Sequence, residues 1–104
     1  MLFFVRFDVR QADRMSNRDL IEMWDREADA ALGAMDAGAI KHAWKVSGQR
    51  VVLAVCDFPD AETLDRALSS LPIITEMGAT VKTEALPIYE YTTFAADLKQ
   101  AVAG

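Results

Sequence analysis

Glu27 is the residue of this 104-residue chain that is best placed to do chemistry. It lies within an apolar stripe that has the spacing of one helix face, formed by Leu20, Trp24, Ala31 and Met35. A carboxylate buried among apolar neighbours loses hydration, and its pKa rises from about 4.3 towards neutrality. Such a group can take up a proton and return it, which is what acid–base catalysis of an isomerisation requires.

Glu27 also has a structural interpretation. Its flexible side chain could reach water from the edge of the stripe, or its carboxylate could pair with a basic residue such as Arg26, Lys41 or Lys45. Structural ion pairs perturb pKa values as well. The residue type and spacing leave both interpretations open, so the rest of the chain has to separate them.

Composition limits the classes of partner. With 52% hydrophobic residues, a chain of this length is expected to form one domain with a modest core. The net charge of −5 and the lack of a Lys/Arg cluster argue against nucleic acid or an anionic membrane as a partner. Neither nucleic acid nor a membrane is therefore expected as a partner.

The few metal-binding and nucleophilic residue types also exclude some chemistry. Cys56 is the only cysteine, and with a single histidine the chain has no recognisable His/Cys metal cluster. Cys56 ends the apolar run from Val51, which favours a buried hydrophobe over a nucleophile. The first residues, with Arg6 and Asp8 close behind them, lack the features of a signal peptide, so we expect a cytoplasmic protein.

Six elements are expected to position Glu27. Ser16 as N-cap, with Asp19 three residues later, predicts a helix that begins near Asn17 and runs to about Ala37, before Gly38. Apolar residues that alternate along the chain predict the strands, and Gly48-Gln49 predicts a hairpin turn. A second helix is predicted to begin at Pro59-Asp60 and to end near Leu71-Pro72. The predicted strands cover residues 2–9, 40–47, 50–57 and about 80–86.

This order of elements predicts an α+β fold, a ferredoxin-like βαββαβ antiparallel sheet with both helices on one face. The third strand is apolar on both faces, so a second copy of the chain is expected to cover the open face, as in a dimeric α+β barrel. Residues 1–86 would form this domain. Residues 87–104 carry Tyr89, Tyr91 and Phe94 and are expected to form an arm with a short helix that packs on its own or a neighbouring subunit.

The second predicted strand supplies further candidate residues. His42 and Trp44 alternate with Lys41 and Lys45, and strand periodicity places both on the face that carries Ile40. We expect this face to lie under the helices, so that His42 and Glu27 converge. A histidine there could equally be a hydrogen-bonded core residue.

The stretch Lys41-His42-Ala43-Trp44-Lys45-Val46-Ser47-Gly48 resembles the Arg-His-x-Trp-Arg-x-x-Gly pattern of the muconolactone Δ-isomerases. Together with Glu27, Asp57 and Leu71-Pro72, the resemblance is nearly collinear through Leu86. It implies a ferredoxin-like, cofactor-independent enzyme that forms a closed homo-oligomer, a dimer or a decamer. Family members shift a C=C bond in an unsaturated lactone during bacterial degradation of aromatic compounds.

The resemblance also implies residue roles. Glu27 would remove a proton next to the lactone carbonyl system and return it two carbons away, and His42 or a backbone N–H would stabilise the oxygen of the intermediate. In an isomerase of this kind, the chain's own Trp24, Trp44 and Phe4 would shape the pocket.

Several positions differ from the family pattern. Trp24 and Ala28 on the first helix, and Phe4 and Val52 on the strands, make the predicted site more apolar than the family pattern. Arg6 and Arg50 are the remaining candidates, with Lys41 and Lys45, for binding the carboxylate of the family's substrate, although each is more simply interpreted as a solvated charge at the edge of the fold.

Three hypotheses about function follow. The first is an isomerase acting on a small unsaturated lactone or related carbonyl compound that is more apolar than muconolactone. The second is another small-molecule enzyme on the same scaffold, such as a cofactor-free monooxygenase, a cyclase or a dehydratase. The third is a non-catalytic ligand-binding module, since ferredoxin-like domains host many unrelated functions.

Overall fold

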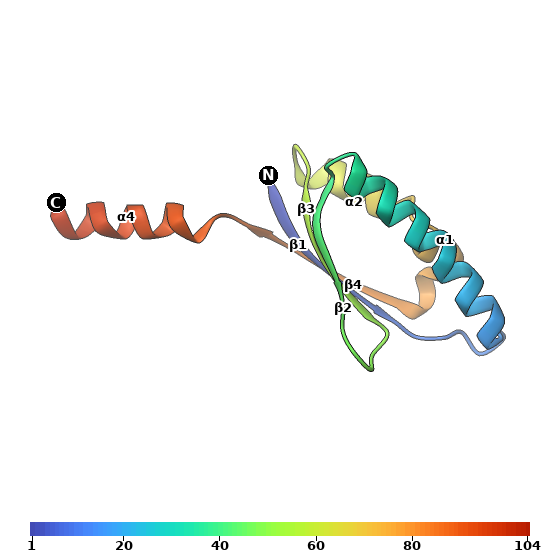
Figure 1. Ribbon diagram of the computed structural model, residues 1–104. Coiled ribbons are helices and arrows are strands. Elements are labelled where there is room, and N and C mark those ends of the chain that lie inside the picture. The colour runs from blue at the N-terminus through green and yellow to red at the C-terminus, as the bar shows by residue number, and fades with distance from the viewer.

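The computed structural model describes all 104 residues and has the predicted strand order with additional short helices. The elements are β1 (Leu2–Val9), α1 (Asn17–Asp36), β2 (Ile40–Lys45), β3 (Val51–Asp57), α2 (Ala61–Ser69), α3 (Pro72–Met77), the 3₁₀ turn η1 (Gly78–Thr80), β4 (Val81–Ile88) and α4 (Tyr91–Ala103). The four strands form one antiparallel sheet in the order β2-β3-β1-β4. As Figure 1 shows, α1 and α2 lie on one face of this sheet. The predicted ferredoxin-like α+β fold is therefore confirmed.

The predicted caps of α1 are present. The Asp19 amide donates to Ser16 Oγ at 3.0 Å, and the Ser16 amide donates to Asp19 Oδ2 at 3.2 Å, which together form a capping box. Gly38, just after the helix, has φ +83°, a conformation that favours glycine. The helix therefore begins at the predicted residue and ends within one residue of the predicted end.

Helix α3 was not predicted. We expected one helix to end near Leu71-Pro72, whereas α2 ends at Ser69 and a new helix begins at Pro72. Proline has no N–H to donate inside a helix, but it fits the first turn, where that N–H would have no intrahelical partner. Pro72 therefore starts a helix, and the next residue, Ile73, is brought over α1.

The core under α1 is densely filled at one end. Leu20 and Met23 are almost completely buried and pack with Phe7 and Val9 of β1 and with Met77 at the end of α3. Met23 did not belong to the predicted stripe, yet it is only 1% exposed. The buried face of α1 is therefore rotated slightly towards Met23, and Glu27, one turn later, stays on this face.

The other face of the sheet is open. No helix of the chain covers it in Figure 1, and α4 extends away from the rest of the molecule. Large apolar side chains that are 37% to 57% exposed remain on this face: Trp44, Leu86 and Ile88. None of the helices is long and apolar enough to cross a membrane.

Candidate active site

A cavity of about 370 Å³ lies between α1 and the sheet, with α2 and α3 at its sides. It exists because the side chains around it are small. Before Glu27, the large side chains of Leu20 and Met23 fill the space between α1 and the sheet. After Glu27, α1 presents alanines to the sheet instead. The alanines that line the cavity are Ala28, Ala30, Ala31, Ala34, Ala43, Ala54 and Ala67.

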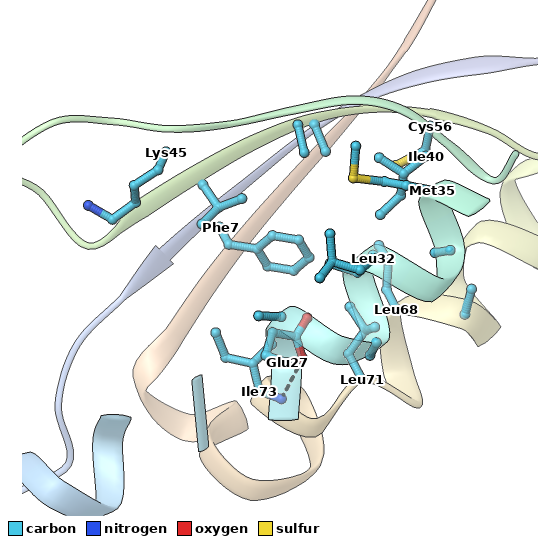
Figure 2. A pocket seen from close by; sticks show the side chains of 18 of the residues that line it. Phe7, Glu27, Leu32, Met35, Ile40, Lys45, Cys56, Leu68, Leu71 and Ile73 are labelled. Carbon is cyan, nitrogen blue, oxygen red and sulfur yellow. Dashed lines mark hydrogen bonds between the residues drawn. The ribbon is translucent and has the colours of Figure 1, made fainter. Parts of the chain in front are cut away.

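Glu27 is half-buried in the wall of this cavity. Of the 21 lining residues 19 are hydrophobic, and the other two are Glu27 and Lys45. Figure 2 shows one carboxylate oxygen of Glu27 bonded to Ile73, while the other points into the cavity. Glu27 thus places a proton-accepting oxygen in an otherwise apolar space.

The environment of Glu27 acts on its pKa in two directions. Loss of hydration raises the pKa of the carboxyl group, and the hydrogen bond from the Ile73 amide, 3.1 Å from Oε2, partly offsets this by lowering it. The net direction is upward. Because the N-cap residue Leu71 has no side chain that can cap α3, Glu27 also supplies the carboxylate that satisfies an amide of its first turn.

None of the expected basic partners pairs with Glu27. Arg26 is bonded to Glu76, and Lys41 lies 3.9 Å from Asp57. Lys45 donates to two backbone carbonyls of the β2–β3 turn, and in Figure 2 its ammonium group points away from the cavity. The interpretation of Glu27 as one member of a structural ion pair is therefore wrong.

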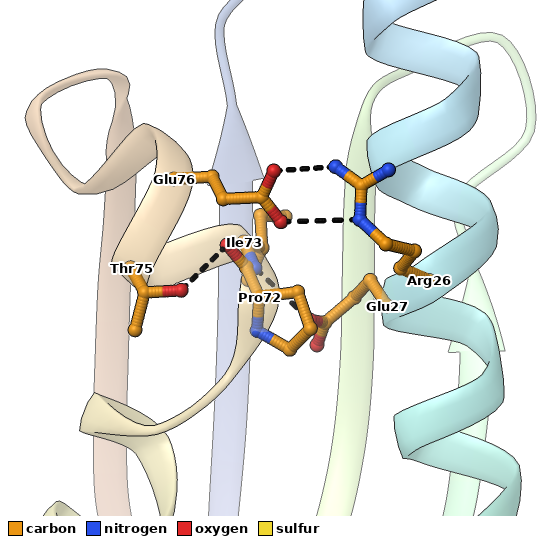
Figure 3. Close-up of polar contacts among 6 residues, drawn as sticks. All are labelled: Arg26, Glu27, Pro72, Ile73, Thr75 and Glu76. Carbon is orange, nitrogen blue, oxygen red and sulfur yellow. Dashed lines mark hydrogen bonds and ion pairs between the residues drawn. The ribbon is translucent and has the colours of Figure 1, made fainter.

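Arg26 instead joins α1 to α3 beside Glu27. Its guanidinium donates twice to the Glu76 carboxylate, with Nε 3.3 Å from Oε2. Figure 3 shows that this ion pair and the bond from Ile73 to Glu27 link the same two helices. Because the ion pair is exposed, it contributes little to the free energy of unfolding, and its main effect is to hold α3 against α1.

The expectation that His42 converges with Glu27 is wrong. A register shift separates Ile40, opposite Cys56, from His42, opposite Val55. This irregularity breaks the simple alternation, so Ala43 packs against the core under the helices, whereas His42 is exposed on the open face. His42 stacks there on Trp44, with ring centroids 5.7 Å apart.

The candidate binding residues are divided between the two faces. Trp24 lines the cavity one turn before Glu27, and Trp44 contributes to its edge although its ring stacks on His42. Phe4 and Arg6 pair with β3 residues of the open face, and Arg6 lies 3.6 Å from Asp8. Arg50 is exposed and is not part of the cavity wall. Of the candidate binding residues, only Trp24 therefore lies with Glu27 on the face under the helices, and Trp44 reaches the edge of the cavity from the exposed strand β2.

Two features of the site were missed at the sequence level. Ile73 acts through its backbone amide, which no residue type reveals, although Pro72 at the start of a helix was an available signal. Of the alanines that line the cavity, only Ala28 and Ala31 belonged to the predicted surroundings of Glu27. Cys56 lines the cavity as the predicted buried hydrophobe, and burial raises the pKa of its thiol.

The fold is shared with a protein of known structure. The crystal structure of muconolactone isomerase superposes with a TM-score of 0.73 at 23% sequence identity, covering 86% of this chain and 90% of that chain. An uncharacterized NIPSNAP domain protein from Burkholderia xenovorans gives a TM-score of 0.45 at 14% identity, over 88% of this chain and 97% of that chain, which is too low to bear on function. No curated protein sequence matches this chain.

The match to a sequence family covers most of the chain. The family described as muconolactone Δ-isomerase matches residues 1–93, which include every strand, α1 to α3 and the cavity. The chain belongs to the muconolactone Δ-isomerase family.

Proposed function

We propose that this chain is a cofactor-independent isomerase that shifts a C=C bond in a small unsaturated lactone or related carbonyl compound by a Glu27-mediated 1,3-proton transfer. The family and the fold suggest an isomerase. The observation that carries the proposal is the free oxygen of Glu27, which faces an apolar cavity and has no cationic partner.

The proposed step begins with ionised Glu27. Its free oxygen removes a proton from the carbon between the carbonyl and the double bond; the C–H bond breaks, an O–H bond forms on Glu27, and the electron pair enters a dienolate. Glu27 then returns the proton to the carbon two atoms away, which places the double bond in its new position. The raised pKa supports both halves, because it makes the carboxylate a stronger base and still allows the carboxyl group to act as an acid.

The dienolate oxygen requires a donor. His42 lies on the open face, and the Ile73 amide already donates to Glu27. Among the cavity-lining residues, the tryptophans are the only ones with a neutral side-chain N–H, and Trp24 is three residues before Glu27 on α1. We therefore assign the donor role to the indole N–H of Trp24.

Double-bond migration in a panel of butenolides, followed by NMR, tests the proposal. Wild-type protein should convert at least one member, and Glu27→Gln should lose on the order of 10²–10⁴-fold in rate. Glutamine is a suitable variant because its carbonyl oxygen can still accept from Ile73, so α3 keeps its cap. A folded Glu27→Gln protein with full activity would refute the proposal.

A non-catalytic binding module is the second candidate. The observation that favours it is that Glu27 already caps α3, which is a sufficient structural reason for a carboxylate at this position. In that case the wild type and Glu27→Gln would bind the same apolar ligands, and neither would exchange their protons with solvent. Oxygen consumption with a quinol substrate would instead indicate a cofactor-free monooxygenase.

We also propose that the chain acts as a homo-oligomer. Apolar side chains are exposed both on the open face of the sheet and on α4, where Tyr91, Phe94 and Leu98 are 40% to 73% exposed. Since β4 extends to Ile88 and α4 does not fold back onto its own sheet, we propose that the part of residues 87–104 that follows β4 forms an arm that packs on a neighbouring copy.

A further inference from the structure

The cavity holds no cation that a charged substrate could use. Lys45 is the only basic residue in its wall, and its ammonium group is committed to the carbonyl oxygens of Val46, at 2.9 Å, and Gln49. Beyond the wall, Arg26 and Lys41 are engaged by Glu76 and Asp57. The only charge directed into the cavity is therefore negative, on Glu27.

A substrate carboxylate would be strongly disfavoured in this space. It would exchange water for apolar walls without gaining an ion pair or a hydrogen-bond donor to replace its hydration. It would also oppose the ionised form of Glu27, and this repulsion would further raise the pKa of the catalytic group. Both effects act against anions, whereas an uncharged molecule meets neither.

The shape of the cavity indicates where the apolar part of a ligand would lie. On α1 the wall runs from Trp24 past Glu27 to Met35, and the last eight residues of this stretch span about 12 Å along the helix. Small alanines leave this length free, while Leu68 and Leu71 close the side opposite β2. A ring held at Glu27 would therefore have room for an apolar substituent that extends towards Met35.

The entrance is apolar as well. All exposed residues of the cavity wall belong to α1 and β2, which places the opening between these two elements. Leu32 is 60% exposed and Met35 is 40% exposed at this opening. Exposed large apolar side chains next to a cavity of this kind favour the entry of an apolar molecule.

We propose that the substrate of this pocket is an uncharged unsaturated carbonyl compound with an apolar substituent that extends from Glu27 towards Met35, and that compounds with a free carboxylate on that substituent are excluded. This inference rests on the proposed proton transfer by Glu27 for its catalytic part. The choice between neutral and anionic ligands rests on the cavity wall alone.

Three matched butenolides test it: one with a carboxymethyl group, its methyl ester, and one with an alkyl group of the same length. The ester and the alkyl compound should exceed the acid by about 100-fold or more in kcat/KM at pH 8. Equal or faster conversion of the acid would overturn the substrate class while leaving the proposed function intact. If no compound is converted, the proposed function fails, and affinities from NMR titration decide the substrate class, since the acid should bind most weakly.

Two substitutions locate the selectivity in this cavity. Met35→Arg places a cation at the opening and should raise the ratio of kcat/KM for the acid to kcat/KM for the ester by about tenfold. Met35→Gln, whose side chain is of similar length but uncharged, should leave this ratio unchanged. Ala31→Leu fills the cavity and should weaken binding of the alkyl compound, while Ala61→Leu, on an exposed position of α2, should not. An unchanged acid-to-ester ratio in Met35→Arg would contradict the proposed position of the substituent.

Discussion

The backbone amide of Ile73 donates to the carboxylate of Glu27 at 3.1 Å, so the first turn of α3 anchors the only acidic side chain in the cavity. This contact occupies one carboxylate oxygen and leaves the other facing the apolar space (Figure 2). The same bond makes Glu27 a cap of α3, so the local fold and the proposed chemistry depend on one side chain.

Ionisation of Glu27 should cost stability. The folded-state pKa of Glu27 is raised, so the protonated carboxyl group contributes to the free energy of unfolding. This contribution is fully present below the unfolded-state pKa of about 4.3 and is lost as pH rises through the folded-state pKa. Glu27→Gln removes this titration but keeps an acceptor for Ile73. Urea unfolding should show the wild type losing stability relative to Glu27→Gln as pH rises from 4 to 8, and a constant difference would contradict the raised pKa.

Trp24→Phe should lower kcat with little change in fold. Phenylalanine keeps a large aromatic ring in the cavity wall but has no N–H, so a donor to the dienolate oxygen is lost. Removal of one such donor costs on the order of 10²-fold in kcat. Trp44→Phe is the matched control, because Trp44 lies at the edge and stacks on His42; an equal loss in both variants would exclude a specific role for Trp24.

The Arg26–Glu76 ion pair should tune Glu27 through α3. Without it α3 is less firmly held to α1, the bond from Ile73 to Glu27 is formed less often, and the pKa of Glu27 should rise further because this bond lowers it. Arg26→Met should therefore move the acidic limb of the kcat/KM profile to higher pH. Arg66→Met is the control, since Arg66 forms its ion pair with Glu62 within α2. An unshifted profile in Arg26→Met would show that the ion pair has no positioning role.

Removal of residues 91–104 should lower the oligomeric state if α4 packs on a neighbouring copy. The exposed apolar residues of α4 supply the contact, and the strands and the cavity lie outside the deleted segment. Light scattering after size exclusion should show a larger assembly for the full chain than for the shortened one. Equal masses for both proteins would remove α4 from the interface.

Local sequence signals predicted most of the fold. Strand alternation and the capping box at Ser16 depend on neighbours in the chain, and the structure reproduces both. The start of α3 at Pro72 was missed because the same proline was interpreted as the end of the preceding helix. Both interpretations use the missing N–H of proline, and only tertiary packing distinguishes them.

The site was predicted less completely, for a related reason. Glu27 could be found because helix periodicity extends over five turns of α1. His42 could not be placed, since one register irregularity after Ile40 moves the following side chains of β2 to the opposite face. The anchor of Glu27 is a backbone amide from a residue 46 positions away, and such a contact has no signature in residue type.

Solvent-deuterium exchange tests the role of Glu27 most directly. A converted butenolide is incubated in D₂O with wild-type protein and with Glu27→Gln, and NMR follows deuterium at the carbon that loses the proton and at the carbon two atoms away. Ionised Glu27 carries the substrate's own proton, so deuterium enters at either carbon only when the protonated Glu27 exchanges with D₂O before it returns the proton. Double-bond migration and any such incorporation of deuterium should both fall on the order of 10²–10⁴-fold with Glu27→Gln. Migration or exchange that proceeds equally fast in a folded Glu27→Gln protein would contradict this role.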